Sequence, residues 1–159
     1  MLKPLKNPLQ IVLVAPQIPP NTGNIARLCA VTGSKLILIE PLGFSIADRD
    51  LKRAGLDYWD KVFVSLHRSY EEYLACYPTS QRVLFSARAR RSLYEVDFAE
   101  GNHLVFGSET RGLSQDILEG GSDVVANIPM LEGRRSLNLS TAVGIATYEA
   151  LRQTGASAG

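Results

Sequence analysis

Short runs of consecutive apolar residues limit the folds that this chain can adopt. Residues 10–15 contain five consecutive apolar residues before Pro16, and residues 35–40 contain four before Pro41. Strands with one face in water alternate apolar and polar residues, whereas strands covered on both faces are apolar throughout. Both runs therefore predict buried strands of a parallel sheet.

Further strand candidates alternate with helical patterns along the chain. The strand candidates are residues 62–64, 82–86, 103–106 and 124–128, and the helical patterns are residues 21–33, 69–77, 115–118 and 137–153. We expect Asn21 and Ser114 to cap the first and third helices, and Gly33 to end the first. This alternation predicts an α/β fold, with a mostly parallel sheet and helices on both faces.

Length and composition fit one domain of ordinary size. The 159 residues carry a formal charge of +1, which excludes a strongly basic nucleic-acid coat protein but allows a local basic patch. We expect residues 1–159 to form a single domain with flexible ends at 1–8 and 155–159. No apolar run reaches the roughly 18–20 residues that cross a bilayer, and the start lacks the apolar core of a signal peptide. We therefore expect a cytoplasmic protein.

Three polar segments that contain glycine follow predicted strands. They are residues 19–27, 107–112 and 129–140. In open parallel sheets, ligands bind beyond the carboxyl ends of the strands. We therefore expect these segments to contribute to one binding site.

The first two segments each allow a functional and a purely structural interpretation. Arg27 lies one helical turn from Asn24 and away from the apolar stripe, where it suits a phosphate or a ribose. A capped helix with a solvated arginine explains the same pattern. Glu109 stands between glycines and can accept hydrogen bonds from a hydroxyl or an amine, whereas a surface turn with a Glu109–Arg111 ion pair is the alternative. Taken separately, each segment favours the structural interpretation.

The third segment places three polar side chains at the start of the last helix. Ser136, Asn138 and Ser140 are all candidates for its N-cap. Three such residues beside Gly133 and two arginines exceed what one cap requires. The surplus indicates a binding surface.

Several familiar catalytic and binding patterns are absent from the sequence. It contains no Gly-x-Gly-x-x-Gly dinucleotide motif, no Walker-type phosphate loop and no Gly-x-Ser-x-Gly nucleophile elbow. Cys29 and Cys76 lack the spacing of metal ligands, so we expect no metal site. His67 and His103 stand alone in the sequence, and we interpret them as structural or surface residues.

Taken together and in order, the three segments resemble the signature motifs of the SPOUT class of RNA methyltransferases. The matching stretches are residues 21–27, 104–113, 128–130 and 135–140. The sequence is similar, from residue 11 to residue 153, to the small tRNA 2′-O-methyltransferases that act at wobble position 34. Residues 53–58 resemble a segment of this subfamily that larger relatives do not share.

The resemblance implies a trefoil knot in the C-terminal half, an S-adenosylmethionine cofactor, a homodimer and a tRNA substrate. It also implies methylation of C34 or U34, with leucine tRNAs as the substrates. The cofactor would lie in the knot, bound largely by backbone groups of Ala87, Gly107, Ile128, Met130, Ser136 and Asn138. The residues expected around the reacting ribose hydroxyl are Asn21, Arg27, Glu109, Ser136 and Asn138.

We expect two further roles for arginines. Because a guanidinium stays protonated, we expect Arg27 to bind a phosphate and stabilise developing oxyanion charge rather than to act as the base. We expect a strip for RNA phosphates, assembled across a dimer, although a solvated basic loop also explains residues 88–91. The strip comprises Arg88, Arg90, Arg91, Arg134 and Arg135.

The alternative functions are ribose 2′-O-methylation at another tRNA or rRNA position, and RNA binding by a non-catalytic relative.

Overall fold

One sheet of seven strands forms the centre of the computed structural model, which describes residues 1–47, 49 and 59–156. The strands are β1 (Gln10–Val14), β2 (Lys35–Ile39), β3 (Phe63–His67), β4 (Arg82–Phe85), β5 (Arg91–Ser92), β6 (His103–Phe106) and β7 (Val124–Asn127). The helices are α1 (Pro19–Thr32), α3 (Trp59–Val62), α4 (Tyr70–Cys76), α5 (Gln115–Glu119) and α6 (Leu139–Gln153), with a 3-10 turn at Leu93–Glu95. The order across the sheet is β3-β2-β1-β6-β4-β7-β5, and each strand is parallel to its neighbours.

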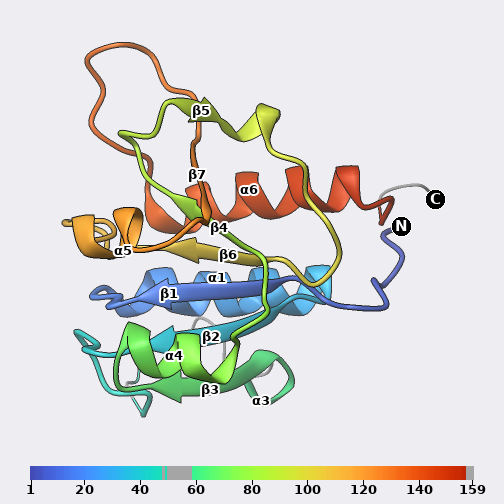
Figure 1. Cartoon of the computed structure of the whole chain (residues 1–159). Coiled ribbons are helices and arrows are strands. Elements are labelled where there is room, and N and C mark those ends of the chain that lie inside the picture. The colour runs from blue at the N-terminus through green and yellow to red at the C-terminus, as the bar shows by residue number, and fades with distance from the viewer. Residues whose placement is uncertain (48, 50–58, 157–159) are drawn as a thin grey trace.

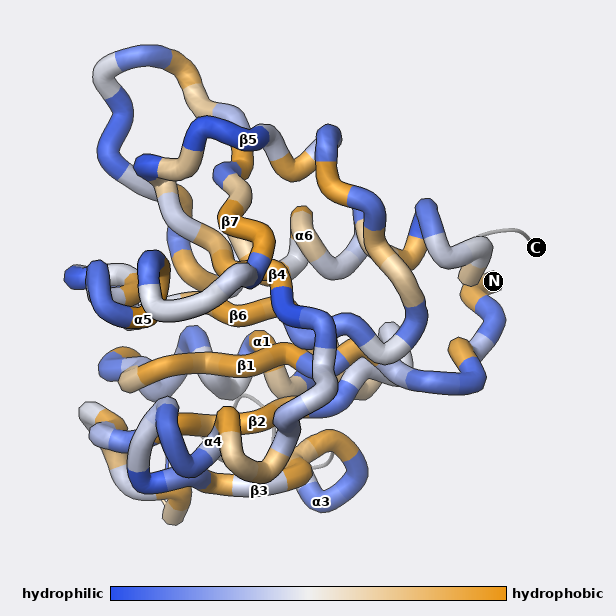
Figure 2. The backbone as a smooth tube through the Cα atoms, viewed as in Figure 1, coloured by the Kyte–Doolittle hydropathy of each residue, from blue (hydrophilic) through white to orange (hydrophobic). Residues whose placement is uncertain are grey.

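Alternate residues of each strand face opposite layers of helices. Ile11 and Leu13 of β1 belong to a core cluster with α1 and α6, whereas Val12 packs with Tyr73 of α4 and with Leu113. In Figure 1, α1 and α6 lie behind the sheet and α4 and α5 lie in front of it. Figure 2 shows β1, β2, β6 and β7 as apolar bands, whereas β5 and many residues of the surrounding loops are polar. Both faces of the sheet are thus covered, and the predicted α/β fold is confirmed.

The strand order reverses at β1, which is therefore a topological switch point of the sheet. The chain first proceeds from β1 to β2 and β3 on one side, and the later strands lie on the other side, where β6 pairs with β1. Open α/β sheets bind ligands at such a point. Further along, β7 enters between β4 and β5, with Val124 beside Val83 and Ala126 beside Arg91. The trefoil knot that the resemblance implies stays a prediction.

Helix α1 begins earlier than the sequence predicts. Its first residues are Pro19 and Pro20, and its N-cap is Ile18, whose side chain makes no capping hydrogen bond. The expectation that Asn21 caps this helix is therefore wrong. Proline suits the first turn because its missing N–H would have no helical partner there. Gly33 ends the helix in the left-handed conformation, with φ 74°, as expected.

Other boundaries follow the sequence more closely. Ser114 accepts a hydrogen bond from Ile117 N and caps α5, as expected. Helix α6 begins at Leu139, with Asn138 as its N-cap. The strand expected at 62–64 runs instead from Phe63 to His67, because the residue before it ends α3.

The two ends of the described chain lie against each other. Lys3 N donates a hydrogen bond to Ala156 O at 2.8 Å, and Leu2 and Leu5 pack against the core. No sequence pattern indicates these contacts. Residues 53–58, which resemble the subfamily segment, lie outside the described residues. Within the described part of the chain, no helix is both long and apolar enough to cross a membrane.

Candidate active site

A cavity of about 420 Å³, here called the main cavity, opens at the carboxyl ends of β4, β6 and β7. Its lining comes from the ends of these strands and the loops that follow them, from α5 and from the first turn of α6. The rings of Phe85 and Phe106 line it and stack on each other, with centroids 4.7 Å apart. The cavity thus combines an apolar aromatic wall with polar loops, which is typical of sites for small organic ligands.

The main cavity brings together most of the residues expected to hold a cofactor. The lining includes Ala87, Gly107, Ile128, Met130 and Ser136. Asn138 does not line it. Instead, its side-chain Oδ1 accepts a hydrogen bond from Thr141 N at 3.3 Å and caps α6, the structural alternative that the sequence had left open.

Gly107 allows the loop after β6 to fold tightly over itself. Gly112 N donates to Ser108 O at 2.9 Å, and Gly112 adopts φ 66°. A Cβ atom on Gly107 would lie only 2.0 Å from the carbonyl carbon of Gly112. A side chain at Gly107 is therefore incompatible with this turn, which places Glu109 at the edge of the main cavity.

Glu109 binds the start of α1 from a distant part of the chain. Its carboxylate accepts hydrogen bonds from Gln17 N at 2.8 Å, Ile18 N at 3.0 Å and Asn21 Nδ2 at 3.3 Å. The helix dipole favours a negative charge at this position, and Glu109 holds the backbone immediately before the helix, whose N-cap Ile18 has no capping side chain. The alternative ion pair between Glu109 and Arg111 does not form.

Asn21 links Glu109 to the start of α6. Its Nδ2 donates to Glu109, and its Oδ1 accepts from Asn138 Nδ2 at 3.1 Å. The Oδ1 atom of Asn138 accepts in turn from Ser140 Oγ at 2.6 Å. Glu109, Asn21 and Asn138 therefore form a row of hydrogen bonds, here called the polar row, which ties the loop after β6 to the N-termini of α1 and α6.

Arg27 lies apart from the polar row. It is exposed on α1, six residues beyond Asn21, a separation of about 9 Å along the helix axis. It is not among the residues that line the main cavity of its own chain. One chain thus brings Asn21, Glu109 and Asn138 into contact, with Ser136 in the cavity wall, and leaves Arg27 outside.

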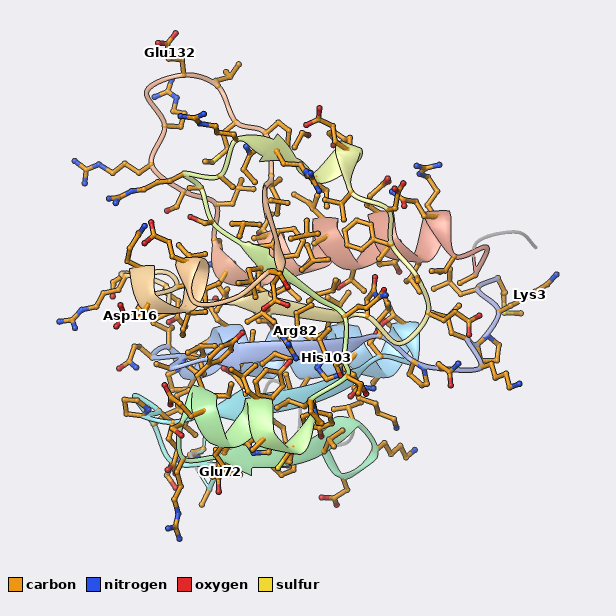
Figure 3. All side chains as sticks on the ribbon, in the orientation of Figure 1. Lys3, Glu72, Arg82, His103, Asp116 and Glu132 are labelled. Atoms are coloured by element: carbon orange, nitrogen blue, oxygen red, sulfur yellow. The ribbon has the colours of Figure 1, made fainter. Side chains whose placement is uncertain are left out.

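The expected arginine strip divides between two cavities. Arg88 and Arg135 line the main cavity, together with Arg111, which the sequence analysis had not assigned to RNA. Arg90 and Arg91 line a second cavity of about 470 Å³, here called the basic hollow. Arg134 is exposed on the loop between β7 and α6, which projects away from the sheet with Glu132 at its tip (Figure 3).

The loop that carries residues 88–91 is held by hydrogen bonds. Ser86 Oγ accepts from Arg88 N at 3.3 Å, and Asn127 Nδ2 donates to Ala89 O at 2.6 Å. Arg91 then pairs beside β7 as the first residue of β5. The arginines therefore project from a fixed backbone, but their side chains are exposed, so the solvated basic loop that the sequence also allowed stays an alternative.

A buried aromatic cluster lies away from the main cavity, at the amino ends of β4 and β6. The Tyr73 hydroxyl contacts His103 Nδ1 at 2.6 Å, and Figure 3 shows His103 beside Arg82. Burial, reinforced by the charge of Arg82, lowers the pKa of His103 to about 4, and burial raises the pKa of Tyr73. This environment agrees with the structural role expected for His103.

The comparison with protein families decides the assignment of the chain. The model of the SpoU rRNA Methylase family matches residues 8–148. The chain belongs to this family. The relation to the SPOUT methyltransferases inferred from the three motifs is thus confirmed, and the motifs of this SpoU methylase are the segments that build the main cavity and the polar row.

Curated relatives match the SpoU methylase over nearly its whole length. The tRNA (cytidine(34)-2'-O)-methyltransferase of Saccharophagus degradans is 48% identical over 91% of this chain and 95% of the relative. The enzyme of the same name from Escherichia coli K12 is 44% identical over 92% of this chain and 94% of the relative. These similarities confirm that the chain is a methyltransferase.

Solved structures share the fold. A structure concerned with the 2-OH methylation of C/U34 on tRNA is 47% identical, with a TM-score of 0.87 over 92% of this chain and 96% of that one. The SpoU methyltransferase AviRb from Streptomyces viridochromogenes, in complex with AdoMet, has a TM-score of 0.83 at 24% identity. It covers 94% of this chain and 62% of AviRb, and shows a common fold.

Proposed function

We propose that this SpoU methylase transfers a methyl group from S-adenosylmethionine to the ribose 2′-hydroxyl of C34 or U34 in tRNA. The names of relatives that are 44–48% identical over almost the full chain support this substrate. The structural observation that carries the proposal is the polar row at the edge of the main cavity. It joins the first, second and third motifs, whose residues the reaction requires in one place.

The main cavity fits S-adenosylmethionine in size and chemistry. The stacked Phe85 and Phe106 rings offer an apolar surface to an adenine, and Gly107 allows the tight turn whose backbone lines the cavity. The guanidinium groups of Arg88, Arg111 and Arg135 suit the carboxylate of the methionine moiety. When bound, the cofactor supplies an electrophilic methyl group on its sulfonium.

Glu109 acts as a positioning residue in this proposal. Both of its carboxylate oxygens accept hydrogen bonds from the start of α1. These bonds hold the first motif against the second, and Asn21 extends the connection to Asn138. We assign contact with the ribose to Ser136, which is exposed and lines the main cavity. Alignment of the hydroxyl with the methyl group is the main contribution of such fixed groups.

We infer that Arg27 binds the phosphate next to the reacting ribose. We also infer that the functional unit is a homodimer. Arg27 lies outside its own main cavity, so a second copy must bring an Arg27 to it. Exposed apolar side chains on the helical layer beside Arg27 support such an association, with Val31 58%, Tyr148 49% and Ile145 36% exposed. In this arrangement the guanidinium binds the phosphate and stabilises the developing oxyanion.

Arginines beyond the main cavity provide the tRNA-binding surface of this near-neutral protein. Arg90 and Arg91 project from the fixed edge of β5, and Arg134 projects from the loop before α6. Guanidinium groups bind phosphates through paired N–H donors, and a row of them follows an RNA backbone. A tRNA substrate also fits the cytoplasmic location that the sequence predicts.

The experiment that tests this function is methylation of a defined tRNA. Leucine tRNA transcripts with C34 or U34 are incubated with the purified chain and methyl-labelled S-adenosylmethionine, and their nucleosides are separated by mass spectrometry. We expect a 2′-O-methylated nucleoside at position 34. A transcript with 2′-deoxycytidine at position 34 is the matched control and should stay unlabelled. Absence of label from both ribose substrates, or equal label in the deoxy control, would reject the proposal.

A further inference from the structure

A third cavity lies at the same edge of the sheet, on the far side of β1 from the main cavity. Its volume is about 620 Å³, and it is formed by the loop after β2 and the end of β3. We call it the side hollow. Its lining includes Glu40, Leu42, Phe44, Ile46, Leu66 and Arg68. The wall thus combines an aromatic ring and aliphatic side chains with one carboxylate and one guanidinium.

Gln17 connects the side hollow to the polar row. Its backbone N–H donates to Glu109 Oε2 at 2.8 Å, and its side-chain Nε2 donates to Pro41 O, on the wall of the side hollow, at 3.4 Å. Gly43 N donates to Pro16 O at 3.0 Å. A Cβ on Gly43 would lie 2.6 Å from Gln17 O, so only glycine allows this close approach. The loop of the side hollow is therefore packed directly on the residue that positions Glu109.

The register of the sheet places Glu40 and Arg68, the two charged residues of the side hollow, next to each other. Ile39 lies beside His67 in the β2–β3 pair, and Glu40 N donates to His67 O at 2.8 Å. Glu40 and Arg68 therefore leave neighbouring strands at the same level. Both side chains line the side hollow, and they form no ion pair with each other. A carboxylate acceptor and a guanidinium donor are thus offered together at one site.

This chemistry suits a pyrimidine base. A carboxylate accepts a hydrogen bond from the N4 amino group of cytosine, and a guanidinium donates to the O4 atom of uracil. An aromatic ring such as that of Phe44 provides a surface on which an unpaired base can stack. Gln17 contacts both the wall of the side hollow and Glu109 of the polar row, so the two sites are neighbours. One acceptor and one donor together explain how a single site accommodates either C or U.

We propose that the side hollow binds the base of the nucleotide whose ribose is methylated, with Glu40 recognising cytosine and Arg68 recognising uracil. This inference rests on the proposed function, because it concerns the same tRNA nucleotide. It adds two specificity residues that lie outside all three motifs. It predicts that variants of Glu40 and Arg68 shift the preference between C34 and U34 in opposite directions. A merely structural role of the loop would not produce opposite shifts.

The test compares C34 and U34 leucine tRNAs in the methylation assay. Glu40→Gln removes the carboxylate acceptor and adds a donor that matches O4 of uracil, so the ratio of kcat/KM for C34 over U34 should fall about tenfold. Arg68→Met removes the donor and should raise the same ratio. Glu71→Gln on α4 and Lys61→Met on α3, both exposed and outside the side hollow, are matched controls that should leave it unchanged.

The outcomes separate the inference from the function on which it rests. Shifts of the C34/U34 ratio in opposite directions, with unchanged affinity for S-adenosylmethionine in calorimetry, would support base recognition. An unchanged ratio in both variants, or an equal loss of activity on both tRNAs, would overturn it while leaving the function intact. Failure of the wild-type chain to methylate either tRNA would reject the proposed function, and the inference with it.

Discussion

The side-chain amide of Asn138 donates to Oδ1 of Asn21 at 3.1 Å, although 117 positions separate the two residues. This bond joins the N-termini of α1 and α6, the two helices that cover one face of the sheet. Asn138 also caps α6 through its other side-chain atom. One residue therefore combines a local structural role with a long-range connection to Glu109 through Asn21.

The substitution Asn138→Asp separates the two roles. Aspartate keeps the capping oxygen but loses the donor to Asn21, and it brings a negative charge near Glu109. We expect the free energy of unfolding, measured in urea, to change by less than about 1 kcal/mol, while kcat/KM falls at least tenfold.

Ser114→Ala is the matched control for that variant. It removes the cap of α5 and should cost about 1 kcal/mol of stability without a loss of activity. Normal activity of Asn138→Asp would show that the polar row has no part in the reaction.

Arg27→Lys tests the role assigned to the first-motif arginine. Lysine keeps the positive charge but cannot form paired N–H contacts to a phosphate. We expect kcat to fall about a hundredfold, because one stabilising contact to the developing charge is lost. Near-normal turnover of this variant would contradict the assignment.

Mixed dimers test whether Arg27 acts on the cavity of a second copy. Arg27→Ala and Ser136→Ala should each be inactive alone. A dimer with one chain of each kind would contain one complete site, so mixing should restore about half of the wild-type activity per mixed dimer. No recovery on mixing, with dimers demonstrated by light scattering, would place Arg27 and Ser136 in the same chain's site.

Salt dependence tests the arginine surface. Each phosphate contact releases counterions, so we expect the tRNA dissociation constant to rise about a hundredfold between 50 and 200 mM salt. Arg90→Ser and Arg91→Ser should each reduce the slope of log Kd against log salt by about 1. Arg152→Ser removes an exposed arginine that pairs with Glu149, and it serves as the control. A tRNA dissociation constant that does not change with salt would contradict a role of the basic hollow in tRNA binding.

Stability should depend on pH through His103. Burial lowers the pKa of His103 from 6.5 to about 4, so the unfolded chain takes up this proton first as the pH falls. The free energy of unfolding should therefore decrease between pH 6.5 and 4, by about 3 kcal/mol from this residue. His103→Gln keeps an acceptor for the Tyr73 hydroxyl but does not titrate. Urea unfolding at pH 7 and 4.5 should show a smaller decrease for the variant, and equal decreases would contradict this origin.

Much of the fold could be predicted because burial on both faces leaves a plain sequence pattern. Residues 36–39 are apolar throughout, and they form the four buried residues of β2. Strand β3 was harder, because it is an edge strand with Val64 and Leu66 exposed, and its run is interrupted. Strand β5 has only two residues and owes its position to pairing with β7, which no local pattern reveals.

Some residues of the candidate site could be located from the sequence, but their contacts could not. Three segments at strand ends identified Asn21, Glu109 and Ser136, yet the sequence placed Asn21 at a cap. The backbone N–H of Ile18 instead donates to Glu109, 91 residues away, so local helix signals could not find this contact. A retrospective signal exists: two prolines follow Ile18, which has no capping side chain, and the helix start therefore needs an acceptor from elsewhere.

The most direct test of the account is calorimetric titration of S-adenosylmethionine into the wild-type chain and into Ala87→Leu. The new side chain projects into the main cavity from an exposed position, and Ala75→Leu, exposed on α4, is its matched control. We predict saturable binding to the wild type and to Ala75→Leu, and at least tenfold weaker binding to Ala87→Leu. No binding by the wild type, or equal affinity of all three proteins, would contradict the claim that the three motifs build a methyl-donor site.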